Sequence, residues 1–147
     1  MIRIEESIDV AREPATIYEL LSSVERYPEW LPGVTAAEQT SPGPVAEGTT
    51  SQLRLVGPTG PIVAAGVVVA AEPPRRLALR GQAPQGRVEG ELDLEPGDAG
   101  TKLTVRMQVE LGGMYRFAEG LVAGELRRSM PGNLARIRER LESATPA

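Results

Sequence analysis

The 147-residue sequence has no cysteine and no histidine, and these absences exclude most familiar catalytic and metal centres. Without cysteine there are no disulfides, thiolate metal sites or cysteine nucleophiles. Without histidine the chain lacks the commonest metal ligand and the side chain that titrates near neutral pH, so a Ser-His-Asp triad cannot form. We therefore expect no metal and no other cofactor.

Lysine is nearly absent as well, because Lys102 is the only one in the chain. A single lysine leaves little room for Schiff-base chemistry. Any acid–base work would fall to aspartate, glutamate or tyrosine, or to an arginine that stabilises charge. The net charge of −4 argues against a wide surface for nucleic acid, so we expect no nucleic-acid partner.

Long hydrophobic runs are missing too. No apolar run approaches the length of about 18 residues that suggests a membrane span. The N-terminus alternates like a strand and lacks the apolar core of a signal peptide. The lack of cysteine is compatible with the cytoplasmic location that we expect. The length favours one domain over residues 1–147.

The residues that are present alternate in hydrophobicity over much of the chain. Residues 2–10 form a predicted strand with Ile2, Ile4, Ile8 and Val10 on one face, where Glu6 also falls. Pro14 opens a short predicted helix, and a second short helix or turn covers about residues 23–31. Further strands are predicted over 34–39, 49–56, 61–71 (bent at Gly66), 76–80, 87–95 and 102–111.

One long helical segment, residues 114–142, follows the last predicted strand. It carries apolar residues at helical spacing, and we expect Pro131-Gly132 to kink or break it near residues 129–132. Strict alternation in the strands predicts an antiparallel sheet with one apolar face, which this helix would cover. The sequence therefore predicts an α+β fold: a curved antiparallel sheet of six to seven strands around a long C-terminal helix, with two short helices after the first strand.

Three stretches resemble a known superfamily. AREPATIYELLSSVERYPEWLPGV (residues 11–34) and NLARIRERLES (133–143) resemble the first helices and the last helix of the START-like (SRPBCC) superfamily, in particular its polyketide cyclase/dehydrase and coenzyme Q-binding families. The middle, VGPTGPIVAAGVVVAAEPPRRLALRG with GTKLTVRMQVELGG, is more similar to another family of that superfamily, which is linked to carbon monoxide dehydrogenase. The resemblance implies a helix-grip fold with a cavity between sheet and long helix.

The resemblance also implies which residues line that cavity. Inward strand positions and one stripe of the long helix are expected there: Leu53, Leu55, Val88, Leu92, Val105, Met107, Met114, Phe117 and Leu121. Several inward positions are small, which leaves space for a ligand or permits close packing. Glu6 and Arg128 are the polar candidates inside, with exposure at the cavity ends as the alternative for each.

Two of the five aromatic residues, Tyr27 and Trp30, lie in the proline-containing stretch SVERYPEWLPGV, where Trp30 stands between two prolines. By the resemblance this turn forms part of the cavity rim, where a ring with a polar tip suits a ligand contact. Trp30 can equally anchor the turn to the core. For every apolar candidate, ordinary core packing is the competing interpretation.

Three functions remain open from the sequence. The first is binding, transport or presentation of a small hydrophobic molecule such as a lipid, a quinone or a polyketide-like aromatic. The second is a metal-free enzyme of the cyclase/dehydratase type that uses Glu6, Tyr27 or Arg128. The third is an interaction or assembly module for a redox enzyme. Residues 116–142 carry six arginines against four glutamates, and the arginines at 127, 128, 136, 138 and 140 would then face a protein partner or a membrane surface.

Overall fold

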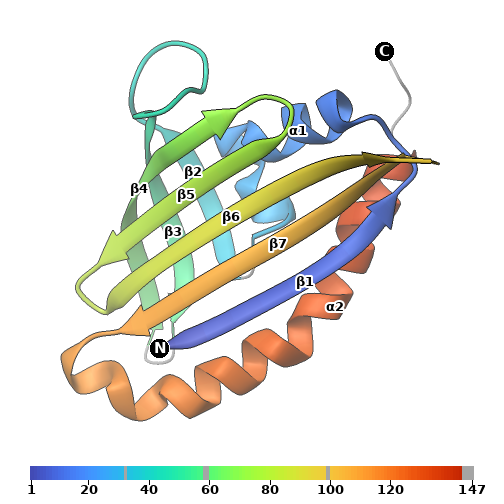
Figure 1. Ribbon diagram of the computed structural model, residues 1–147. Coiled ribbons are helices and arrows are strands. Elements are labelled where there is room, and N and C mark those ends of the chain that lie inside the picture. The colour runs from blue at the N-terminus through green and yellow to red at the C-terminus, as the bar shows by residue number, and fades with distance from the viewer. Residues whose placement is uncertain (32, 58–59, 99, 144–147) are drawn as a thin grey trace.

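The computed structural model describes the chain except residues 32, 58–59, 99 and 144–147 (Figure 1). Seven strands, two α-helices and two short 3₁₀ helices follow one another in the described part. Their order and bounds are β1 (Ile2–Val10), α1 (Pro14–Ser22), η1 (Val24–Glu29), β2 (Val34–Gln39), β3 (Thr50–Gly57), β4 (Gly60–Glu72), β5 (Arg76–Ala83), β6 (Gly86–Gly97), β7 (Gly100–Leu111), η2 (Gly113–Ala118) and α2 (Glu119–Ser143).

The strands form one antiparallel sheet in the order β1-β7-β6-β5-β4-β3-β2. Every neighbouring pair from β2 to β7 is consecutive in the chain, and β1 joins the far side by pairing with β7. The sheet curls, and α1 and η1 lie on its concave side while α2 runs along β1 (Figure 1). This is the predicted helix-grip arrangement, with seven strands and two short helices after β1.

The tightest part of the core lies where α1 and the C-terminal end of α2 meet the sheet. Its largest fully enclosed side chains come from four elements: Ile17, Leu21, Leu77, Leu103 and Leu141. The backbone N–H of Ala11, just after β1, donates to Glu142 Oε2 at 2.9 Å, so the end of α2 is tied to the end of β1. We call this region the closed end of the molecule.

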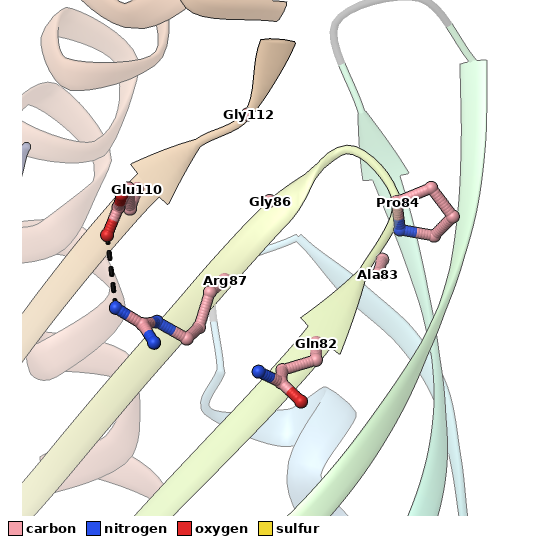
Figure 2. A pocket seen from close by; sticks show the side chains of 7 residues that line it. All are labelled: Gln82, Ala83, Pro84, Gly86, Arg87, Glu110 and Gly112. Carbon is pink, nitrogen blue, oxygen red and sulfur yellow. Dashed lines mark hydrogen bonds and ion pairs between the residues drawn. The ribbon is translucent and has the colours of Figure 1, made fainter.

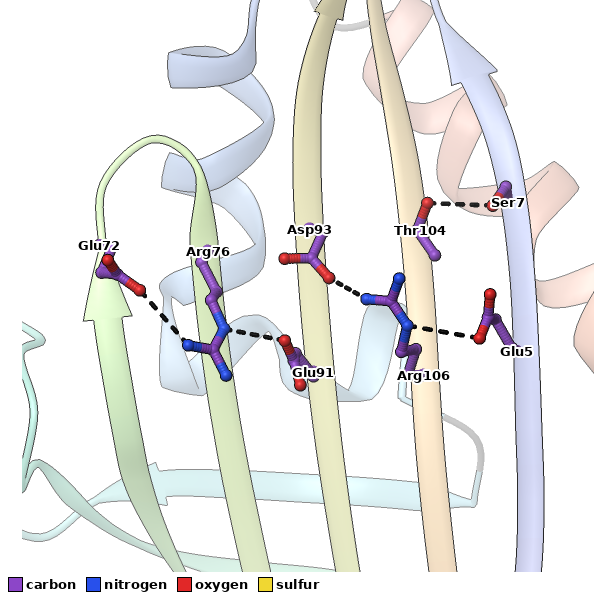
Figure 3. Close-up of polar contacts among 8 residues, drawn as sticks. All are labelled: Glu5, Ser7, Glu72, Arg76, Glu91, Asp93, Thr104 and Arg106. Atoms are coloured by element: carbon purple, nitrogen blue, oxygen red, sulfur yellow. Dashed lines mark hydrogen bonds and ion pairs between the residues drawn. The ribbon is translucent and has the colours of Figure 1, made fainter.

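The convex face of the sheet carries charged side chains that pair across strands (Figure 3). Arg106 on β7 lies between Glu5, at 3.3 Å, and Asp93. Arg76 on β5 lies 2.8 Å from Glu91 and 3.5 Å from Glu72. Cross-strand pairs of opposite charge suit a face in contact with water. This face is therefore a poor binding surface for an apolar molecule.

A kink or a break is predicted near residues 129–132, and the break is wrong, because α2 continues through Pro131 to Ser143. Proline removes one backbone hydrogen bond from a helix. Met130 and Leu134, on either side of it, are both buried against the sheet side of the molecule. This packing holds the two halves in one helix, since tertiary contacts outweigh local propensity. In β4 the irregularity lies between Val68 and Ala70 rather than at the predicted Gly66.

Candidate ligand-binding site

The concave face is covered unevenly. α2 packs on β1, and on β7, the strand next to it, the inward side chains Met107 and Val109 are buried. Their cross-strand neighbours on β6 are Gly90 and Val88. Val88 is only half-buried, as is Leu79, which pairs with Gly90 from β5. Cover is therefore lost on passing from β7 to β5 in this part of the sheet, whereas Leu92 and Leu77, nearer the closed end, are buried.

We call this half-covered apolar surface the open concave face. Its members come from β3, β5, β6 and β7, and each lies on the inward side of its strand: Leu55, Leu79, Val88, Gly90 and Leu111. The four side chains are partly buried and pack against the core. These side chains are already partly accessible, so an apolar molecule can pack against them without any part of the fold opening first.

Gly90 marks room above β6. A Cβ atom added there would meet no heavy atom within 4 Å. At Gly66, also inward, an added Cβ would lie 2.3 Å from Ser51 Oγ and 3.4 Å from Leu53 Cδ1. Glycine thus serves two purposes on this face: close packing of Leu53 at Gly66, and unfilled space at Gly90.

Tyr27 and Trp30 form an aromatic pair beside this face. Their ring centroids lie 5.6 Å apart with an interplanar angle of 80°, an edge-to-face contact. Both rings are buried. Burial first, and then the nearby Glu25 and Tyr18, raises the pKa of Tyr27, which therefore stays a neutral donor. η1, which carries Tyr27, packs on β2. The burial of Trp30 fits an anchoring role, and a ligand contact stays a prediction.

The strand residues predicted to face inward do so. Leu53, Leu92, Val105 and Met107 are buried, and Leu55 and Val88 are half-buried. Whether any of them contacts a ligand stays a prediction.

The helical residues predicted for the cavity lie elsewhere. Phe117 is 78% exposed and Leu121 is 71% exposed, so their predicted inward placement is wrong. The buried face of α2 contains Met130 and Leu134 instead. The side chain of Met114 lies outside the described part of the structure.

The two charged candidates do not come together. Glu6 pairs in register with Val105 and so lies on the inward side of β1, but it is exposed at this edge strand. Arg128 is exposed on α2 and lies 3.2 Å from Glu125. The predicted inward position of Arg128 is therefore wrong, because its part of the helix surface faces away from the sheet.

A hollow of about 580 Å³ lies at the tip of the sheet, at the ends of β5, β6 and β7 (Figure 2). Ala83 and Gly86 contribute from the inward side, whereas Gln82 and the ion pair between Arg87 and Glu110, at 3.1 Å, belong to the convex side. The hollow curves around the ends of these three strands and opens widely to solvent. Its polar rim makes it a poor match for an apolar ligand.

The sequence of the chain matches a family profile over residues 1–142. That profile is described as polyketide cyclase / dehydrase and lipid transport. The chain belongs to this family. The family and the fold are those of a small hydrophobic ligand-binding domain, within the START-like superfamily that the sequence resembles.

Solved structures of other proteins share the fold of this chain. The Zhui aromatase/cyclase of Streptomyces sp. R1128 superposes with a TM-score of 0.77 at 17% identity, over 95% of this chain and 93% of its own. A START superfamily protein of Mycobacterium smegmatis gives 0.75 at 19% identity, over 97% and 99%. At such identities the likeness establishes the fold alone.

An uncharacterized protein of Mycobacterium tuberculosis (strain H37Rv) is 30% identical over 114 residues, which are 75% of this chain. The chain spans 66% of the length of that relative.

Within the described residues, no helix of the family member is long and apolar enough to span a membrane. The same residues contain no cluster of three or more side chains suited to hold a metal ion.

Tyr18 is a buried polar residue that the sequence alone did not single out. It lies on α1 and is 8% exposed, and burial and then Glu72 raise its pKa. Its hydroxyl and the Trp30 Nε1 are buried without a hydrogen-bond partner in the described structure. A single tyrosine on the apolar face of a helix is typical of core packing, so the sequence contained no signal for it beyond the scarcity of aromatic residues.

Proposed function

We propose that the chain, as one domain, binds a small hydrophobic molecule on the open concave face, for transport or presentation. The observation that carries the proposal is the incomplete cover of this face: apolar, half-buried side chains surround the unfilled space at Gly90. Apolar surface in a concave setting with a few polar groups is typical of small-molecule sites. Lipids, quinones and polyketide-like aromatics are the candidate classes.

The test is native mass spectrometry of the protein purified from its expression host, followed by organic extraction and identification of what was bound. We expect a mass above that of the 15.7 kDa chain, and an extracted apolar compound that accounts for the difference. Denaturing mass spectrometry of the same sample is the control, since it removes a non-covalent ligand. A bare chain that also fails to bind added apolar probes would contradict the proposal.

The cyclase/dehydratase alternative has less support. Of its three candidate residues, Glu6 and Arg128, the two charged ones, are both exposed. Tyr27 remains as a buried donor that could polarise a carbonyl. The assembly-module alternative stays a prediction.

A second candidate function is contact with an anionic lipid surface through the outer face of α2. Phe117, on η2 just before α2, and Leu121, in the first turns of α2, expose large apolar side chains, and Arg128 is exposed further along α2. Residues 116–142 carry six arginines against four glutamates in a chain of net charge −4. Apolar side chains among arginines suit the boundary of an anionic bilayer.

Co-sedimentation with vesicles tests this second function. We expect binding to phosphatidylglycerol-rich vesicles that weakens as salt rises, and severalfold weaker binding of a Phe117→Ser/Leu121→Ser double variant. Val56→Ser is the matched control, because Val56 is 70% exposed on β3, away from α2. Equal sedimentation of the double variant and the wild type would rule out this surface.

A further inference from the structure

Two buried hydrogen-bond donors on the concave side have no acceptor. The Tyr18 hydroxyl and the Trp30 indole N–H are both inaccessible to solvent and unpaired within the described structure. The side chains are 8% and 6% exposed. Buried polar groups in native proteins nearly always have partners, because an unpaired donor keeps the cost of leaving water. These two donors therefore mark a place where an acceptor is missing.

Both donors lie near Tyr27. Trp30 packs edge-to-face on Tyr27, and Tyr18 is close enough to contribute, after burial and Glu25, to the raised pKa of Tyr27. Tyr18 lies on α1 and Trp30 directly follows η1, and both helices lie on the concave side of the sheet (Figure 1). α1 packs on β6, the strand that carries Gly90. The donors thus lie on the side of the sheet where an apolar ligand would bind.

The chemistry of the donors limits what they recognise. A phenol hydroxyl and an indole N–H are neutral, and the indole can only donate. Each can donate a hydrogen bond to a neutral oxygen acceptor such as a ketone, quinone or phenol oxygen. A hydrocarbon or a bare acyl chain would leave both donors unpaired, and a site built to donate hydrogen bonds rejects an analogue that lacks the acceptor.

We propose that the ligand is an oxygenated apolar molecule, and that Tyr18 Oη and Trp30 Nε1 donate hydrogen bonds to its carbonyl or hydroxyl oxygens. This rests on the proposed binding function and narrows its ligand class. Quinones and polyketide-like aromatics fit it, whereas saturated lipid tails do not. Tyr18 and Trp30 are ligand-contacting residues in this proposal.

A matched pair of probes tests the proposal by equilibrium dialysis: 2-methyl-1,4-naphthoquinone and 2-methylnaphthalene, which share a ring system and differ in two carbonyl oxygens. We expect the wild type to favour the quinone. In Tyr18→Phe and in Trp30→Phe we expect quinone affinity to fall about five- to tenfold, with little change for the hydrocarbon. Tyr115→Phe on η2 is the control and should bind both probes as the wild type does.

A stability measurement separates ligand recognition from a structural role of the hydroxyl. Phenylalanine keeps the ring and removes only the unpaired group, so ligand-free Tyr18→Phe should melt at the same temperature as the wild type or higher. A lower melting temperature would show that the hydroxyl is needed by the fold and would overturn the proposal. Equal wild-type affinity for the two probes would overturn it while leaving the binding function intact. Binding of neither probe would overturn both.

Discussion

A Gly90→Phe variant is expected to fold and to lose affinity for apolar ligands by about tenfold or more, which corresponds to about 1.4 kcal/mol or more of binding free energy. The reason is local space. An added Cβ at Gly90 meets nothing within 4 Å, so a larger side chain can enter the open concave face without displacing the sheet. The ring then occupies the volume that the ligand would use. Titration with the apolar probes and thermal melting of each variant give the two readouts.

Gln108→Phe is the matched control for this substitution. Gln108 lies on β7 beside the register position of Gly90, but it is exposed and points to the convex face. The Gln108→Phe substitution introduces the same ring on the convex face of the sheet and should leave the affinity for apolar ligands unchanged. Gly90→Ala should lie between, with a small loss of affinity. Unchanged binding by a folded Gly90→Phe protein would place the ligand elsewhere and contradict the proposed site.

The strands could be predicted because the sheet has one wet face and one apolar face. In β7, Leu103, Val105 and Met107 point inward while Arg106 points outward to its ion pairs, so the sequence alternates with the period of a strand. A register error would turn this whole set outward, which is why the pattern is so regular. The same parity placed Leu53 and Val88 on the concave side correctly.

The helical part of the site could not be predicted in the same way. The C-terminal segment has two apolar stripes, and the sequence does not say which one meets the sheet. In the structure the stripe with Met130 and Leu134 is buried and the one with Phe117 and Leu121 is exposed. The first turn is also a 3₁₀ helix, η2, which changes the residue spacing just before α2 begins. Phe117 therefore does not follow the α-helical stripe assumed for it.

The unfilled space at Gly90 could not be predicted from the sequence either. Small residues on an inward face are compatible with close packing and with open space, and both occur here. At Gly66 an added Cβ would collide with Ser51 and contact Leu53, whereas at Gly90 it would meet no heavy atom within 4 Å. The difference depends on which side chains lie above each strand, which is a property of the assembled fold.

Gly100→Ala is expected to destabilise the protein by about 2–5 kcal/mol, because it combines backbone strain with a backbone collision. Gly100 opens β7 with φ of +149°, in the region that favours glycine. An added Cβ would lie 2.1 Å from the Val10 carbonyl oxygen and 2.9 Å from Ala11 Cα. Both are main-chain atoms at the closed end, so neither can rotate aside. Urea unfolding should show a lower midpoint with an unchanged m-value.

Gly43→Ala separates the strain from the collision. Gly43 also has a positive φ, +92°, but an added Cβ there meets nothing within 4 Å. Only the conformational cost remains, so the expected loss is about 1–2 kcal/mol. Next to Gly100, the start of β7 is also tied to the segment after β1, because the Thr101 hydroxyl donates to the Arg12 carbonyl at 2.7 Å. A loss of unfolding free energy in Gly100→Ala no larger than that in Gly43→Ala would contradict the predicted collision between β7 and the end of β1.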